Sequence, residues 1–183
     1  MSFLVVADKP SEMKTAGFTL LELIVVIILI GVLAVTAYSR FQGKDGVVEY
    51  AYQARLVSAL RNMQTRAMQD TRPGYCFLIN LNAGDFGPPS LAYDTTTGNP
   101  PLTCGTSIDF STPDYLRTDA GELTGEGLVL LAPVNHVGFD DMGRPVDNSG
   151  ASICQNQCQL TIQGSVSVPV CIETEGYIHA ASC

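Results

Sequence analysis

Apolar residues are concentrated near the N-terminus, where residues 18–37 form an uninterrupted run with Glu22 as its one charged side chain. A helix rises about 1.5 Å per residue, so a run of this length matches the roughly 30 Å hydrocarbon core of a bilayer. Peptide groups in lipid must bond to one another, which favours a helix. The pattern predicts a transmembrane or assembly helix over residues 18–39.

A second pattern follows, in which apolar residues recur every three or four positions. This spacing places them on one face of a helix; they are Tyr52, Leu56, Leu60, Met63 and Ala67. We expect an amphipathic continuation of the helix over residues 40–72, with this stripe packed under a sheet. The glycines of residues 43–46 predict a hinge or a locally unwound stretch, and Pro73 ends the helix.

Short β-rich runs bounded by Gly, Pro, Asn or Asp make up the rest of the chain. They cover residues 75–81, 127–132, 159–163, 165–172 and 176–180, and residues 82–105 are loop-like. The predicted fold is α+β. A long N-terminal α-helix, apolar in its first half, packs on an antiparallel β-sheet with disulfide-stapled loops in an external region over residues 73–183.

Charge changes sign along the chain. Residues 40–72 carry six basic and three acidic side chains, whereas residues 73–183 carry two basic and twelve acidic ones, a net charge of −10. Binding to nucleic acid depends on clustered cations that displace counterions. We therefore expect no nucleic-acid partner.

All six cysteines lie after the apolar run, and they are Cys76, Cys104, Cys154, Cys158, Cys171 and Cys183. Lysines before the run favour a cytoplasmic N-terminus, which places the cysteines outside, where disulfides persist. Six cysteines allow fifteen pairings. We expect Cys76–Cys104 to close the long loop, with two further bonds among the other four. Cys154 and Cys158 could form half a zinc site, but the oxidising compartment favours disulfides.

Sequence motifs for a catalytic nucleophile, a phosphate-binding loop or a zinc protease are absent. His136 and His179 stand alone, which indicates structural roles. Asp140, Asp141 and Asp147 could supply calcium oxygens, but their spacing matches no EF-hand and a solvated loop is the simpler interpretation. We expect no enzyme, no metal and no cofactor.

Glu22 admits two interpretations, since an ionised carboxylate at membrane depth costs about 2.5–3.5 kcal/mol and is usually functional. Thr19 and Glu22 also fit the capping box that satisfies the first N–H groups of a helix. A further alternative for the whole segment is an ordinary secretory signal, cleaved after Ala37.

Residues 14–24 (KTAGFTLLELI) resemble the class III leader of type IV prepilins and type II secretion pseudopilins. The resemblance implies cleavage after Gly17 by a prepilin peptidase, so that residues 1–17 are a leader, and methylation of the Phe18 amine. It also gives Glu22 a role in assembly, where its carboxylate can meet the N-terminal amine of a neighbouring subunit in an apolar filament core. Many pilins carry proline where this chain has Ser39, so no kink is expected there.

Residues 139–145 and 175–178 resemble the C-terminal region of GspH/FimT-like minor pilins, and the cysteine content is similar to that of minor pilins of mannose-sensitive haemagglutinin (MSHA) pili. The implied function is a minor pilin that supports pilus biogenesis and adhesion, first in the bacterial inner membrane and then on the cell surface. Its implied partners are other pilins, the prepilin peptidase and the inner-membrane assembly platform. Alternatives are a type II secretion pseudopilin and a DNA-binding minor pilin.

Overall fold

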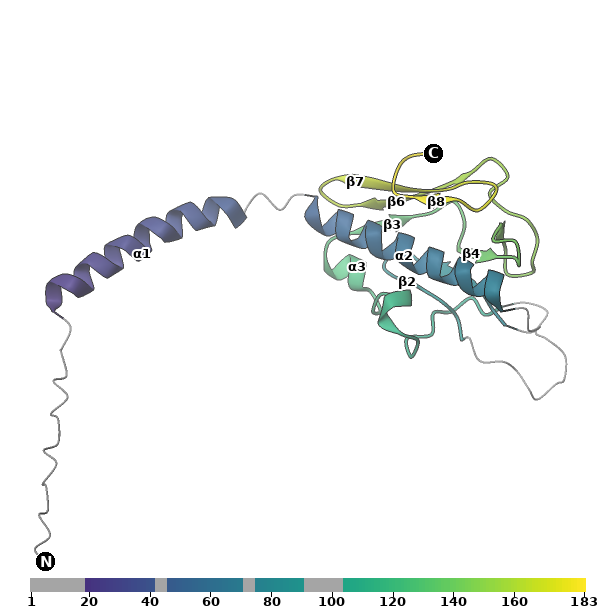
Figure 1. The fold of residues 1–183 in the computed structure, drawn as a ribbon, viewed down its shortest axis with the longest axis horizontal. Coiled ribbons are helices and arrows are strands. Elements are labelled where there is room, and N and C mark those ends of the chain that lie inside the picture. Colours follow the sequence, from purple (N-terminus) through teal and green to yellow (C-terminus); the bar gives the residue numbers. More distant parts are fainter. Residues whose placement is uncertain (1–18, 42–45, 71–74, 91–103) are drawn as a thin grey trace, which may run out of the picture. The chain divides into compact units, whose positions relative to one another are not determined.

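The computed structural model describes residues 19–41, 46–70, 75–90 and 104–183. The chain divides into two compact units, residues 1–43 and residues 44–183 (Figure 1). The first unit contains helix α1 (Leu20–Phe41). The second unit, called the head from here on, contains helix α2 (Val47–Gln69) and all the strands of the described residues.

The strands of the head form two antiparallel sheets. The first has the order β2-β1-β4-β5, from β1 (Leu78–Leu81), β2 (Phe86–Gly87), β4 (His136–Phe139) and β5 (Pro145–Val146). The second has the order β3-β6-β7-β8, from β3 (Val129–Leu131), β6 (Cys158–Gln163), β7 (Ser167–Ile172) and β8 (Ile178–His179). A short 3-10 helix, η1 (Asp114–Leu116), and a single helical turn, α3 (Glu122–Gly125), lie between β2 and β3.

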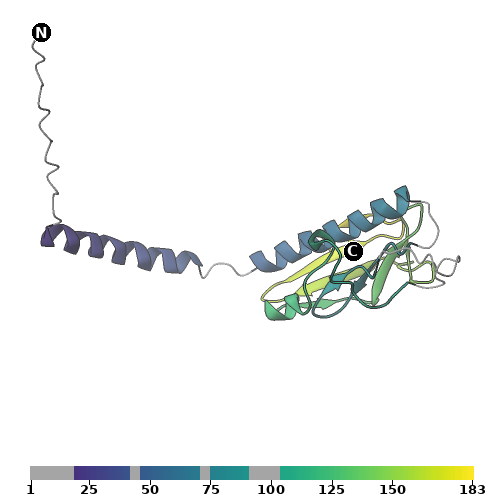
Figure 2. The same cartoon turned by 90° about the horizontal axis from the view of Figure 1, so that it is seen from below.

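Helix α2 lies against both sheets, and its apolar stripe forms the centre of one hydrophobic core (Figure 1). Figure 2 shows the strands gathered on one side of this helix. Leu56, Leu60 and Met63 are fully buried, Ala67 is nearly so, and Tyr52 packs at the edge of the core. The helical stripe predicted from the sequence is therefore confirmed.

The predicted α+β class is confirmed, but the strands divide between two sheets where one was expected. Each predicted β-rich run contains a strand, whereas β2, β4 and β5 were not predicted. These three strands have only two to four residues, and none lies in a longer β-rich run that would reveal it. Their pairing is set by residues far apart in the chain, such as Ile79 opposite Val137.

Gly46, the last of the residues predicted to interrupt the helix, has a non-helical backbone conformation. This residue has φ +94°, a left-handed conformation that glycine adopts without a steric penalty, and α2 begins directly after it. Residues 42–45, which complete the predicted hinge, lie outside the described residues.

Three disulfides link all six cysteines, namely Cys76–Cys104, Cys154–Cys158 and Cys171–Cys183. The first is the pairing expected from the sequence, and the other two resolve the alternatives that the sequence left open. Each joins positions that the loops bring together rather than neighbouring strands of one sheet.

Across the residues that the structure describes, no helix combines the length and the apolar character needed to cross a membrane.

Two methionines of α2 provide a matched test of the core. Met63 is fully buried and Met68 is 52% exposed. Met63→Ala should lower the free energy of unfolding by about 2–5 kcal/mol, because it leaves a cavity, whereas Met68→Ala should cost well under half as much. Urea denaturation of both variants measures the difference. Equal losses would contradict the assignment of the stripe to the core.

Candidate functional site

The N-terminus of α1 is capped by Thr19. Its hydroxyl oxygen accepts a hydrogen bond from the backbone N–H of Glu22 at 3.2 Å, and its carbonyl accepts one from Leu23 at 3.2 Å. This is the Thr half of a capping box, which satisfies one of the N–H groups left unpaired at a helix start. Gly17 and Phe18, the predicted processing residues, lie outside the described residues.

Helix α1 exposes apolar side chains on every face. Consecutive large residues from Leu20 to Leu33 have between 41% and 76% of their surface accessible. A helix that is apolar all round is stable only where something apolar surrounds it, such as lipid or other helices. Within the same stretch the Glu22 side chain is exposed, and no described residue forms an ion pair with it. Its carboxylate is therefore accessible to a group from outside the chain.

The head brings together residues 139–145 and 175–178, the two segments whose sequences resemble minor pilins. The side-chain amide of Gln64 on α2 donates hydrogen bonds to the carbonyls of Gly143 and Gly176, each at 2.7 Å. Gly176 has φ +91°, and a side chain there would clash with the Gly143 carbonyl. The turns after β4 and β7 are thus fastened to the same point of the helix.

Two of the three aspartates considered for calcium, Asp140 and Asp147, accept hydrogen bonds from the protein itself, and the third, Asp141, is exposed. Asp140 accepts from the backbone of Met142 and Arg144 and pairs with the Arg144 guanidinium at 2.8 Å. Burial acts to raise the pKa of Asp140, but these hydrogen bonds and the cation outweigh it and lower the pKa. Asp147 accepts from Ser149 and from the backbone of Ala151. These contacts are typical of ordered turns.

Each of the five arginines whose side chains the structure describes is bound within the head. Two of these arginines donate hydrogen bonds to a backbone carbonyl or a tyrosine hydroxyl, and the other three form ion pairs with carboxylates. The contacts are Arg55 with Glu122 (2.7 Å), Arg61 with the carbonyl of Ile178 (2.6 Å), Arg66 with the hydroxyl of Tyr115 (2.7 Å), Arg117 with Asp114 (2.8 Å) and Arg144 with Asp140 (2.8 Å). The positive charge of α2 therefore stabilises the head and is not gathered into a binding surface.

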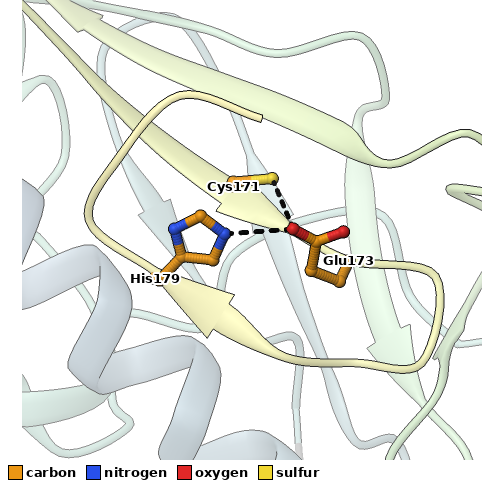
Figure 3. Close-up of side chains that lie close together, drawn as sticks. All are labelled: Cys171, Glu173 and His179. Carbon is orange, nitrogen blue, oxygen red and sulfur yellow. Dashed lines mark hydrogen bonds and ion pairs between the residues drawn. The ribbon is translucent and has the colours of Figure 1, made fainter.

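Side chains from the end of the second sheet form a compact cluster of Cys171, Glu173 and His179 (Figure 3). The Nε2 atom of His179 lies 3.2 Å from Oε1 of Glu173, and the Sγ atom of Cys171 lies 3.8 Å from the same oxygen. The disulfide sulfur of Cys171 has no proton to donate, so the second distance is a contact. Sequence inspection placed His179 alone, because its partner arrives through the pairing of β7 with β8.

A family model described as "Prokaryotic N-terminal methylation motif" matches residues 13–38. This stretch contains Gly17, Phe18 and Glu22 together with most of α1. The chain therefore carries the N-terminal sequence motif that this family model describes.

Among solved structures, two crystal forms of the type IV minor pilin FimU of Pseudomonas aeruginosa are similar to this chain. One is 14% identical, covers 76% of this chain and 92% of that chain, and has a TM-score of 0.48. The other is also 14% identical, covers 73% and 92%, and has a TM-score of 0.44. Among curated proteins, no sequence matches the chain.

Among the carboxyl groups of the described residues, Glu49, near the start of α2, has the most strongly shifted pKa. It is 3% exposed. It accepts a hydrogen bond from the Ser165 hydroxyl at 2.7 Å and one from the Val166 N–H at 3.2 Å. The Ser165 bond, followed by backbone N–H groups, lowers the pKa of Glu49 to about 2. The carboxylate joins the first turn of α2 to the turn between β6 and β7.

This linkage predicts a specific acid sensitivity. Because the folded pKa is about 2 and the ordinary value is 4.5, the stabilisation by Glu49 is complete above pH 4.5 and is lost as the pH falls towards 2. In urea denaturation over this range, Glu49→Gln should give a shallower loss of stability than the wild type. Glu126→Gln, at an exposed glutamate, is the control and should leave the slope unchanged. A wild-type slope in Glu49→Gln would contradict the assignment.

Proposed function

We propose that the protein is a minor pilin of an MSHA-like type IV pilus and supports pilus biogenesis and adhesion. The observation that carries the proposal is the methylation motif on a helix whose apolar side chains are exposed on every face. A subunit with such a helix and a compact, disulfide-linked head has the parts that co-assembly requires. The helices of neighbouring subunits supply the apolar surroundings that this helix needs.

The proposed path begins in the inner membrane. Residues 18–39 anchor the precursor in a single pass, with the N-terminus in the cytoplasm and the region over residues 73–183 in the periplasm. Prepilin peptidase removes residues 1–17 by cutting after Gly17, and the amine of Phe18 is methylated. The assembly platform then moves the mature subunit into the fibre. Lysines before the apolar run and cysteines after it support this orientation.

Glu22 is the proposed assembly residue. A carboxylate and an ammonium group are each costly in an apolar filament core, but a close pair offsets part of that cost. The exposed Glu22 side chain can meet the N-terminal amine of an adjacent subunit. Its backbone N–H is already bonded to Thr19, so the helix start is fixed while the carboxylate stays available.

A type II secretion pseudopilin is the second candidate, because it shares the same processing and the same helix-driven assembly. Neighbouring genes for the secretin and the assembly ATPase would separate the two. A DNA-binding minor pilin is disfavoured by the net charge of −10 over residues 73–183 and by the internal pairing of the described arginines. DNA binding at low salt that weakens steeply with added salt would favour this third candidate.

Processing can be tested on the protein purified from membranes of its native host. Intact mass and N-terminal sequencing should find a chain that starts at Phe18 and carries one added methyl group. Gly17→Leu should block cleavage and leave the longer chain in the membrane. A mature chain starting at Tyr38 would instead indicate ordinary secretion and would remove the role proposed for Glu22.

The role of the Glu22 charge can be separated from capping. Glutamine also fits the capping box, so Glu22→Gln preserves the helix start and removes only the charge. We expect normal processing but at least about a tenfold loss of subunit from sheared pili, equal to roughly 1.4 kcal/mol. Thr19→Val, which removes the cap and keeps the charge, is the matched control and should assemble better. If Glu22→Gln assembles at the wild-type level and Thr19→Val does not, capping is the function of this motif.

A further inference from the structure

We propose that the end of the head where α2 begins docks on the surface of the lipid bilayer through Val47, Tyr50 and Val166, called the docking patch from here on. The inference rests on the proposed anchoring of residues 18–39 and adds a contact that anchoring alone does not require. Val47 is 61% exposed, Tyr50 60% and Val166 36%. A Cβ placed on Gly46 would lie 3.2 Å from Cγ2 of Val166 and 3.6 Å from the Tyr50 ring. The side chains therefore form one patch where the chain enters the head.

Two segments far apart in the sequence supply the docking patch. Val47 and Tyr50 lie in the first turn of α2, and Val166 lies in the turn between β6 and β7. Figures 1 and 2 both show this turn beside the start of α2. The Glu49 carboxylate joins the two segments through its bonds to Ser165 and Val166. The patch is therefore held in shape by the head itself.

The segments that form the docking patch expose no charge. Residues 46–54 and 163–169 contain a single charged side chain, Glu49. It is 3% exposed, because its hydrogen bonds to the β6–β7 turn hold it inside. A charged group that faced outward here would oppose contact with an apolar medium. The inward position of Glu49 leaves an uncharged surface of aliphatic and aromatic groups.

The length of the connecting chain favours the bilayer as the partner. Helix α1 ends at Phe41, and four residues separate it from Gly46. A connection of this length spans less than about 20 Å. When α1 crosses the bilayer as proposed, the docking patch stays within reach of the membrane surface, and even a weak contact is strengthened by the high effective concentration of a tethered group.

The size and chemistry of the docking patch also favour lipid. A specific protein interface uses about 20–30 residues on each side, far more than this patch supplies. Tyrosine is enriched where membranes meet water, because its ring is apolar and its hydroxyl can bond to water or headgroups. The flanking valines add apolar surface. In this role the patch holds the head at the periplasmic leaflet until the subunit leaves the bilayer for the fibre.

Tyr50→Trp tests the contact directly, because the chain has no tryptophan of its own. The full chain is placed in vesicles of phosphatidylethanolamine and phosphatidylglycerol that contain lipid brominated near the headgroup end of its acyl chains. We expect this lipid to quench at least about half of the Tyr50→Trp emission, since a docked tryptophan lies at the interface. Tyr177→Trp is the matched control. Tyr177 is 65% exposed, and its turn is fastened to Gln64, about 27 Å along α2 from Gly46. Its emission should be quenched little.

Val47→Asp, added to Tyr50→Trp, tests whether the patch must be uncharged. An acidic residue is favourable in the first turn of a helix, so the head should keep its fold. We expect the quenching to fall to the level of Tyr177→Trp. Met68→Lys is the control, because it replaces an exposed apolar side chain in the last turn of α2 by the charge that a helix favours there. It should leave the quenching unchanged.

Extraction of the vesicles with alkaline carbonate separates anchoring from docking. Release of the chain would contradict the proposed anchoring and would overturn the docking with it. A chain that stays anchored, but in which Tyr50→Trp is quenched no more than Tyr177→Trp, would overturn the docking alone. Shielding of the Tyr50→Trp fluorophore that increases with the protein-to-lipid ratio and is insensitive to brominated lipid would identify a second copy of the chain as the partner, and would likewise overturn it.

Discussion

The head depends on one interaction, the burial of the α2 stripe against two sheets at once. Leu56, Leu60 and Met63 have no accessible surface, and residues from both sheets join them in a single core. Neither sheet has more than four strands, and several strands have only two residues. Such sheets are marginal alone. The helix supplies the apolar surface that they share. Gln53 and Arg61 donate hydrogen bonds to carbonyls of the second sheet, and Gln64 donates to the turn after β4 of the first sheet and to the turn after β7 of the second.

The two helices differ in how their apolar side chains are distributed and in what covers those side chains. Helix α2 carries a narrow apolar stripe, which its own chain covers, and its arginines bond to the head around that stripe. Helix α1 is apolar on every face and leaves that surface for other molecules. Gly46 has a positive φ and is therefore not helical, so α2 begins after it as a separate helix. The chain therefore separates the part that folds by itself from the part whose burial needs lipid or other subunits.

The sequence was sufficient to predict those features of the fold that depend on residues close together in the chain. The α2 stripe, the α+β class and the Cys76–Cys104 bond all follow from residues near one another or from a loop between two cysteines. The separation of the strands into two sheets does not, because short strands such as β2 and β5 are defined only by their partners. His179 shows the same limit at the site: nothing beside it in the sequence indicates that the β7–β8 register delivers Glu173 to its ring.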